Sequence, residues 1–192
     1  MPQVADARPP ERIDLGDIAL VRWSPGHQHA VNEAVAASIE HLRPWMPWAQ
    51  DANAGTNLDF LERTNEQWRA GMEFAYGVWD RGGTLVGSAS LMDRVGPGSL
   101  EIGYWVRADR VREHIASRAT AALVDVAFTF PAVEVVEIHH DRENEPSGGV
   151  PRSLGFERAG EFEKEPTAPG ESGVFVRWLM RRDSWAARRP DG

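Results

Sequence analysis

The apolar positions near the start of the chain predict a strand followed by a helix. Residues 18–23, IALVRW, form a short apolar run typical of a buried strand. The Ser-Pro pair at Ser24 is a common helix start and opens the segment 24–42. One face of that segment carries apolar residues at helical spacing: Val31, Val35, Ile39 and Leu42.

A proline-rich loop separates this helix from a second one. The loop covers residues 43–55, RPWMPWAQDANAG. Thr56 is a residue type that caps helices, and we predict that it caps a helix over 57–71. Gly71 ends that helix, because glycine readily takes the left-handed conformation that closes helices.

Three apolar runs in succession predict an antiparallel meander. The runs 74–80 and 84–93 are separated by Arg81, Gly82 and Gly83, which predicts a hairpin with a short glycine-rich turn. A Gly-Pro-Gly turn then leads into a strand at 99–109.

The second half alternates helices and strands. Residues 115–130 have helical periodicity, and Pro131 closes the segment. The remaining elements are a strand at 133–141, a short helix at 147–156 and a last strand at 171–185. The order βααβββαβαβ predicts a mixed α/β fold whose central helix connects two neighbouring strands by a crossover.

Length and composition predict a single domain. The 192 residues are 42% hydrophobic, which suits one core. We assign the domain to 13–186, a flexible N-terminal arm to 1–12 and a C-terminal tail to 187–192. No apolar run is long enough to cross a membrane and the first residues lack the blocks of a signal peptide, so we expect a cytoplasmic protein without membrane contact.

Charge and cysteine content narrow the chemistry. The net charge of −8 disfavours nucleic acid as a partner. The absence of cysteine excludes thiolate metal ligands and a thiol nucleophile. We therefore expect no metal, no permanently bound cofactor and no covalent cysteine intermediate.

Five sequence words resemble the GNAT acyltransferase superfamily, nearest its RimJ/RimL branch. They occur in the order RPWMPWA, VGSASL, LEIGYWV, IASRATAALVDVAF and NEPSGGVPRSLGFERAG, and the resemblance as a whole covers residues 12–185. The resemblance implies a GNAT fold of the α/β (α+β) class, with a mixed, mostly antiparallel sheet flanked by helices. It also implies that two parallel strands, 100–106 and 133–140, splay apart and hold the pantetheine arm of an acyl donor between them.

One turn departs from the family pattern. GNAT proteins place glycines after the first splayed strand, where backbone N–H groups at a helix start hold the diphosphate of CoA. The matching residues 111–116 read VREHIA, with Arg112 and His114 at the glycine positions. We expect these side chains to exclude the diphosphate. The alternative is that the turn shifts and CoA still binds.

The predicted donor is therefore a phosphopantetheine thioester on an acyl or peptidyl carrier protein. The resemblance places the pantetheine arm against Tyr104, Trp105, Val106, Asn144 and Ser147. A carrier protein is acidic, and we expect it to dock on Arg107, Arg110, Arg112, His114 and Arg118.

The resemblance also suggests the catalytic groups. Glu101 matches a position where GNAT enzymes place a general base, and His140 is a second candidate. Alternation puts His139 and His140 on opposite faces, so only one of them can point into the site. The family's thiol-protonating tyrosine is replaced by Pro151, which leaves Ser147 as the proton donor.

The acceptor is predicted to be a small-molecule amine in natural-product biosynthesis, for example of an antibiotic. Its binding residues are expected to be Trp45, Trp48, Ser88 and Ser90. Three alternatives remain. The first is an acetyl-CoA-dependent N-acetyltransferase of a protein N-terminus or an antibiotic, and the second is a catalytically inactive GNAT fold used as a binding module. The third is transfer from aminoacyl-tRNA, against which the net charge of −8 counts. The oligomeric state is left open.

Overall fold

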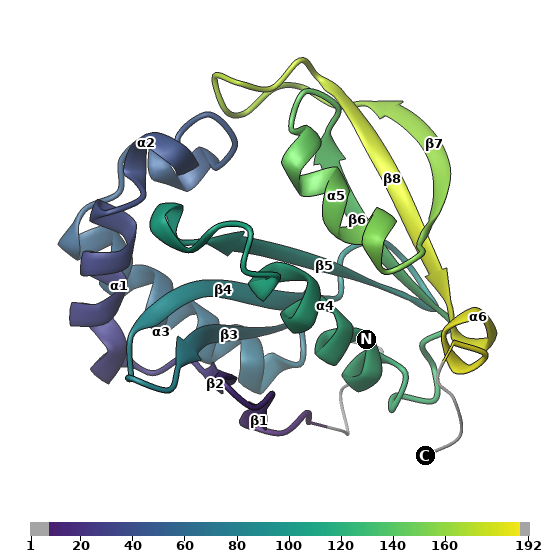
Figure 1. Cartoon of the computed structure of the whole chain (residues 1–192), viewed down its shortest axis with the longest axis horizontal. Coiled ribbons are helices and arrows are strands. Elements are labelled where there is room, and N and C mark those ends of the chain that lie inside the picture. The colour runs from purple at the N-terminus through teal and green to yellow at the C-terminus, as the bar shows by residue number, and fades with distance from the viewer. Residues whose placement is uncertain (1–7, 189–192) are drawn as a thin grey trace.

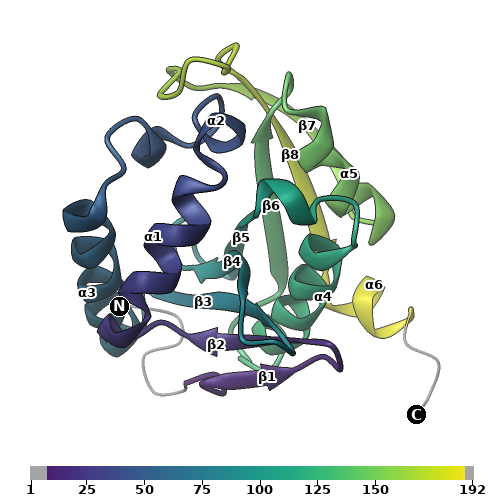
Figure 2. The same ribbon diagram turned by 60° about the vertical axis from the view of Figure 1, so that its left-hand side comes forward.

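The computed structural model describes residues 8–188, which form one eight-stranded sheet with helices on both sides (Figures 1 and 2). The sheet order is β1-β2-β3-β4-β5-β6-β8-β7. The strands are β1 (Arg12–Asp14), β2 (Ile18–Arg22), β3 (Glu73–Asp80), β4 (Leu85–Met92), β5 (Ser99–Val106), β6 (Val135–Asp141), β7 (Glu157–Glu163) and β8 (Val174–Arg181). Every pair is antiparallel except β5 and β6.

Helices cover the two sheet faces. They are α1 (Gln28–Ala36), α2 (Ile39–Leu42), α3 (Ala54–Ala70), α4 (Ile115–Ala127), α5 (Glu145–Ser153) and α6 (Arg182–Ala186), with short 3-10 turns η1 (Pro25–His27), η2 (Pro47–Ala49) and η3 (Ala108–Arg110). Helices α1 and α3 lie on one side of the sheet, and α4 and α5 lie on the other (Figure 2). Among residues 8–188, no helix is both long and apolar enough to cross a bilayer.

Two apolar clusters hold these layers together. The larger one packs the apolar face of α4, including Ile115 and Leu123, against sheet residues such as Leu91 and Ile102. The smaller one joins α1 and α3 to the opposite face of the sheet around Trp23. Burial of apolar surface on both faces makes the sheet a rigid support for the loops at its ends.

The parallel pair β5 and β6 opens into a V. The strands pair only from Ser99 with Val135 to Glu101 with Glu137, and the residues beyond this point run apart (Figure 1). Helix α4 makes the crossover between them. The predicted meander, crossover and splayed pair are thus confirmed.

Several predicted boundaries differ from the structure. The helix expected over 24–42 is divided into η1, α1 and α2, and the break at Ser38 allows its buried hydroxyl to accept a hydrogen bond from the Ala108 amide at 3.0 Å. Asn53, and not Thr56, caps α3, because its side chain accepts from the amides of Gly55 and Thr56. Gly71 closes α3 in the left-handed conformation, as predicted.

The segment before β1 is attached to the domain. Residues 8–12 were assigned to a flexible arm, yet the Tyr76 hydroxyl donates to the Pro10 carbonyl at 2.9 Å, and Arg12 starts β1. Arg8 donates to the Arg69 carbonyl at the end of α3 at 2.6 Å. The rest of the predicted arm and most of the predicted tail, 1–7 and 189–192, lie outside the described residues.

Candidate active site

The turn before α4 keeps a left-handed backbone although it has no glycine. Arg112 has φ 68° and His114, the N-cap of α4, has φ 58°. Such a conformation costs a residue with a Cβ roughly 1–2 kcal/mol, so the surrounding structure must hold it in place. The side chains of both residues are exposed.

This turn also presents unpaired backbone N–H groups. Within the described part of the chain, no acceptor takes up the amides of residues 112–117, and the first helical bond runs from Arg118 N–H to the His114 carbonyl at 3.0 Å. Free amides at a helix start, together with the helix dipole, favour an anion. The expectation that side chains fill this space is therefore not supported by the geometry.

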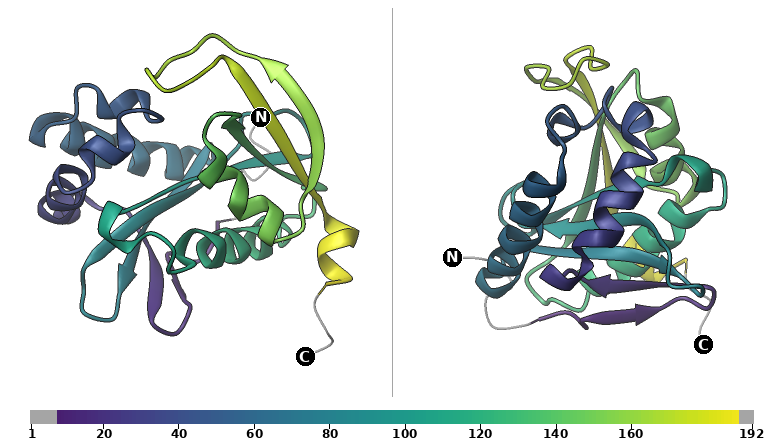
Figure 3. Two further views of the ribbon diagram at one scale, coloured as in Figure 1. Left: turned by 45° about the horizontal axis from the view of Figure 1, so that its top comes forward. Right: turned by 90° about the vertical axis from the view of Figure 1, so that its left-hand side faces the viewer.

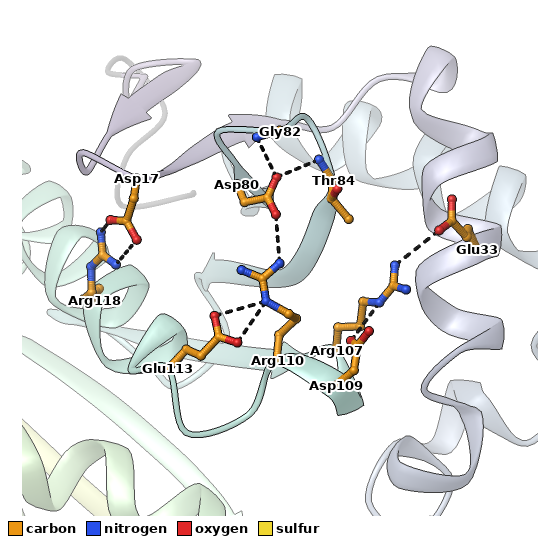
Figure 4. A network of polar contacts seen from close by, with 10 residues as sticks. All are labelled: Asp17, Glu33, Asp80, Gly82, Thr84, Arg107, Asp109, Arg110, Glu113 and Arg118. Carbon is orange, nitrogen blue, oxygen red and sulfur yellow. Dashed lines mark hydrogen bonds and ion pairs between the residues drawn. The ribbon is translucent and has the colours of Figure 1, made fainter.

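An ion-pair network fixes the turn from three sides (Figure 4). Arg110 bridges Asp80 on β3 and Glu113 in the turn, with shortest N–O distances of 2.8 and 3.0 Å. This hydrogen bond from Arg110, with further ones from the Thr84 and Gly82 amides, lowers the pKa of Asp80. Because Glu113 is paired, its charge opposes a bound anion less than an isolated carboxylate would.

The same network engages most of the predicted carrier-docking residues. Arg107 pairs with Glu33 of α1 at 3.4 Å and with Asp109 at 2.9 Å. Arg118 pairs with Asp17 in the turn between β1 and β2. Three of the predicted docking residues, Arg107, Arg110 and Arg118, therefore form ion pairs within the protein. They do not form the unpaired cationic patch that the sequence predicts. Among the described residues, no ion pair or side-chain hydrogen bond involves Arg112 or His114.

A proline in α5 explains how three of the five predicted donor residues, Tyr104, Asn144 and Ser147, meet. Pro151 has no N–H, so the Ser147 carbonyl four residues earlier lacks its helical donor. The Tyr104 hydroxyl takes that place at 2.8 Å, and the Ser147 hydroxyl lies 3.4 Å from the same phenol oxygen. Asn144 accepts from the Ser147 amide at 3.3 Å. Burial raises the pKa of Tyr104, which keeps the phenol protonated.

Glu101 lies on the other face of β5, where the V closes. Its carboxylate is buried, and Arg94 donates to both oxygens at 2.8 and 2.6 Å. Glu137 is its register partner on β6. The His139 ring stands beside both carboxylates, with Nε2 2.8 Å from Glu137 and Nδ1 3.7 Å from Glu101. Sequence reasoning missed Arg94, Glu137 and His139 as members of this site.

His140 has a structural position on the opposite face. Its Nε2 accepts a hydrogen bond from the Trp178 indole at 3.0 Å, and its Nδ1 lies 2.8 Å from the Asp141 carbonyl. Burial lowers the pKa of His140, which favours the neutral ring. Since both ring nitrogens are occupied, the geometry favours His139 over His140 in the site.

The predicted acceptor residues are only partly brought together. Trp48 lies beside Trp105, which was predicted to bind the donor, with ring centroids 6.1 Å apart. Ser90 lies on the same face of the sheet as Glu101. The Ser88 hydroxyl is buried and donates to the Tyr76 carbonyl at 2.9 Å, so it is not available to a ligand. Trp45 is half-buried in the loop after α2.

The loop between β7 and β8 extends toward the segment that follows α2 (Figures 1 and 3). Gly170 donates to the Pro44 carbonyl at 2.8 Å, and a Cβ at Gly170 would lie only 2.6 Å from that oxygen. The base of the loop is anchored by Asp141, which accepts from the Ser172 and Gly173 amides. The loop and the segment after α2 therefore bound one side of the predicted acceptor region.

The sequence comparison identifies the family. Residues 17–157 match the family model described as the acetyltransferase (GNAT) domain. The chain belongs to the GNAT family. It is therefore an acyltransferase, as the resemblance implied. No curated protein matches the sequence.

Solved GNAT structures share the fold. The Mycobacterium smegmatis RimJ in complex with CoA-disulfide is 22% identical, with a TM-score of 0.78 over 86% of this chain and 82% of that chain. RimL, a ribosomal alpha-N-protein acetyltransferase in complex with coenzyme A, is 17% identical, with a TM-score of 0.82 over 91% and 99%. The microcin self-immunity acetyltransferase MccE, in complex with acetyl-CoA and AMP, is 15% identical, with a TM-score of 0.81 over 87% and 93%.

A hollow of about 590 Å³ lies beside the ion-pair network, and two carboxylates of that network, Asp17 and Asp80, line it. It is situated between the β1–β2 and β3–β4 turns and is lined by His27, Trp79 and charged residues such as Arg12 and Asp17. None of the predicted site residues lines it. The candidate site comprises the start of α4, the V between β5 and β6, and the polar groups where the V closes.

Proposed function

We propose that this GNAT protein transfers an acyl group from acyl-CoA to an amine, with the donor diphosphate bound at the start of α4. One observation carries the proposal: Arg112 and His114 hold the left-handed backbone that glycines provide in the family, and the amides of residues 112–117 stay open. The CoA complexes of the solved relatives agree with this choice of donor.

The pantetheine arm would then run along the V toward its closed end. Asn144, Ser147 and Tyr104 meet on the side of the V that faces α5. The chain has no cysteine, so the amine attacks the thioester directly. A new C–N bond forms and the C–S bond breaks. The amine loses a proton to a base where the V closes, and the leaving thiolate takes a proton from the Ser147 hydroxyl, which regains one from solvent.

The acceptor belongs on the opposite face, where the V closes at Glu101. Trp48 and Trp105 offer aromatic surface beside this point. We propose a small-molecule amine as the acceptor, because the Gly170 contact with Pro44 narrows the approach from that side. A role in natural-product biosynthesis stays a prediction.

The first test compares CoA with 4′-phosphopantetheine by calorimetry. We expect the fragment to bind about tenfold or more weakly, since it lacks the diphosphate link whose charged hydrogen bonds are worth roughly 1.5–3 kcal/mol. Acetyl-CoA should also acylate members of an amine panel. Equal affinities for the two ligands would refute the assignment of the diphosphate to α4, and CoA binding without any turnover would favour a binding module.

A carrier-bound phosphopantetheine is the second candidate donor. The observation in its favour is that two large exposed side chains, Arg112 and His114, stand at the open end of the V where the family has glycines. The double variant Arg112→Gly/His114→Gly separates the candidates. Tighter CoA binding is expected if CoA is the donor. Loss of activity with an acylated carrier protein, at unchanged CoA affinity, would favour the carrier.

A further inference from the structure

The His139 ring faces two carboxylates that lie on neighbouring strands. Its Nε2 is 2.8 Å from Glu137 of β6, and its Nδ1 is 3.7 Å from Glu101 of β5. The edge of the Phe162 ring packs against it from β7, with centroids 5.1 Å apart. The His139 side chain is 17% exposed, so it is held in place and still reachable.

Only one tautomer satisfies the closer contact. A neutral His139 donates its Nε2 proton to Glu137, which leaves Nδ1 with a free lone pair at 3.7 Å from Glu101. The 3.7 Å gap then separates two acceptors with no donor between them. An N–H group between them would satisfy both hydrogen-bond acceptors, and the amine substrate of the acyl transfer supplies such a group.

Glu101 itself is poorly placed to take a proton. Arg94 donates to both of its oxygens, through Nε at 2.8 Å and Nη2 at 2.6 Å. A carboxylate in a bidentate pair with guanidinium has both oxygens engaged and a fixed orientation. Glu101 therefore serves to position the amine, and the lone pair that is free to take a proton belongs to His139.

We propose that His139 is the general base of the acyl transfer and that Glu137 is its positioning residue. The inference rests on the acyl-transfer function proposed above. An amine N–H bridges Nδ1 of His139 and Oε2 of Glu101. As the amine nitrogen bonds to the thioester carbon, its proton moves to Nδ1, and the imidazolium is balanced by Glu137.

Few other charged groups face this histidine. Arg177 of β8 is its register partner, and that side chain is exposed. Arg94 reaches the cluster through Glu101. The neighbour from β7 is an aromatic ring, Phe162. Among the described residues, the charged groups in direct contact with His139 are therefore its two carboxylates.

The decisive measurement is the pH dependence of kcat/KM for the full chain with acetyl-CoA and an accepted amine. In His139→Gln we expect kcat to fall about 100-fold to 10,000-fold and the acidic limb of the profile to disappear. The affinity for CoA, measured by calorimetry, should stay within twofold. The exposed His41→Gln is the matched control and should behave as wild type.

Two further variants separate positioning from catalysis. Glu137→Gln should keep measurable activity and move the acidic limb to lower pH, because the imidazolium loses its counter-charge. Glu101→Gln should retain the acidic limb with a raised KM for the amine. If His139→Gln does not fold, the limb shift in Glu137→Gln still decides the matter.

The outcomes distinguish this inference from the proposed function. A wild-type chain that transfers nothing from any thioester refutes both. A wild-type chain that turns over, with His139→Gln within threefold of its kcat and an unchanged acidic limb, refutes only the assignment of the base. Loss of the acidic limb in Glu101→Gln alone would return that role to Glu101.

Discussion

At the scale of single residues, the unusual feature is the left-handed backbone of two residues that carry side chains. The left-handed conformation of Arg112 and His114 lowers the folding stability by roughly 1–2 kcal/mol per residue. A glycine at either position would lower it by only about 0.5–1 kcal/mol, through its extra freedom in the unfolded chain. Arg112→Gly and His114→Gly should therefore each stabilise the protein and raise Tm in a thermal melt.

Glu113, between them, is the control. Its backbone φ is not positive, so glycine relieves no strain there, and its side chain pairs with Arg110. Glu113→Gly should therefore lower Tm. If all three glycine variants lower Tm to the same extent, the left-handed conformation does not strain the turn.

Residue parity explains which parts of the site could be predicted. In the strand LEIGYWV, Leu100 and Ile102 are core residues, so Tyr104 shares their face while Glu101 points the other way. The same rule on β6 places His139 with Glu137, opposite Val136 and Ile138. This alternation separated His139 from His140 in the sequence, but the apolar Val136 and Ile138 were not used to decide which histidine shares the face of Glu101. The Arg94 contact to Glu101 joins a loop to a strand and has no such periodic signal.

At the scale of elements, apolar strands were predictable and polar ones were not. The meander and the crossover follow from apolar runs that are now buried between two helical layers. Strand β7, ERAGEFE, is mostly exposed on the sheet edge and lacks an apolar period, so the sequence carried no strand pattern there. The contact of Gly170 with Pro44 depends on loops far apart in the chain, which local patterns do not encode.

The packing of helix α5 against the sheet can be tested, because its two adjacent glycines have different surroundings. A Cβ at Gly148 would lie 2.7 Å from Nε2 of His140, whereas a Cβ at Gly149 meets nothing within 4 Å. Gly148→Ala should destabilise the protein by roughly 1–3 kcal/mol through overpacking. Gly149→Ala should stabilise it by up to about 1 kcal/mol, because alanine favours helix. Urea denaturation of both variants measures the difference, and similar effects would contradict the close seating of α5 on His140.

At the scale of the whole molecule, buried groups give folding stability a predictable pH dependence. Burial lowers the pKa of His140 and of His27, so the folded protein favours their neutral forms. An unfolded histidine titrates near 6.5, so between that pH and the lower folded pKa the unfolded chain binds more protons. Stability contributed by these groups is complete above about pH 6.5 and is lost as the pH falls.

Two carboxylates extend the same trend to lower pH. The pKa of Asp80 is lowered, chiefly by the hydrogen bond from Arg110. For Asp141 burial acts to raise the pKa, but hydrogen bonds from Glu143, Ser172 and Gly173 outweigh it and the net shift is downward. Their contribution is present above the ordinary aspartate range near 3.9 and is lost only as the pH falls below it. The free energy of unfolding should therefore decrease over two pH ranges, that of the histidines first.

Replacing one histidine tests the loss of stability in the pH range of the histidines. The unfolding free energy from urea titrations should decline between pH 7 and 5 in the wild type, and the decline should be shallower in His140→Gln, because one fewer group takes up a proton on unfolding. The variant starts from lower stability, since Trp178 loses its acceptor, so the slopes and not the absolute values are compared. His29→Gln on the exposed side of α1 should keep the wild-type slope. Equal slopes for wild type and His140→Gln would show that His140 is not held neutral by the fold.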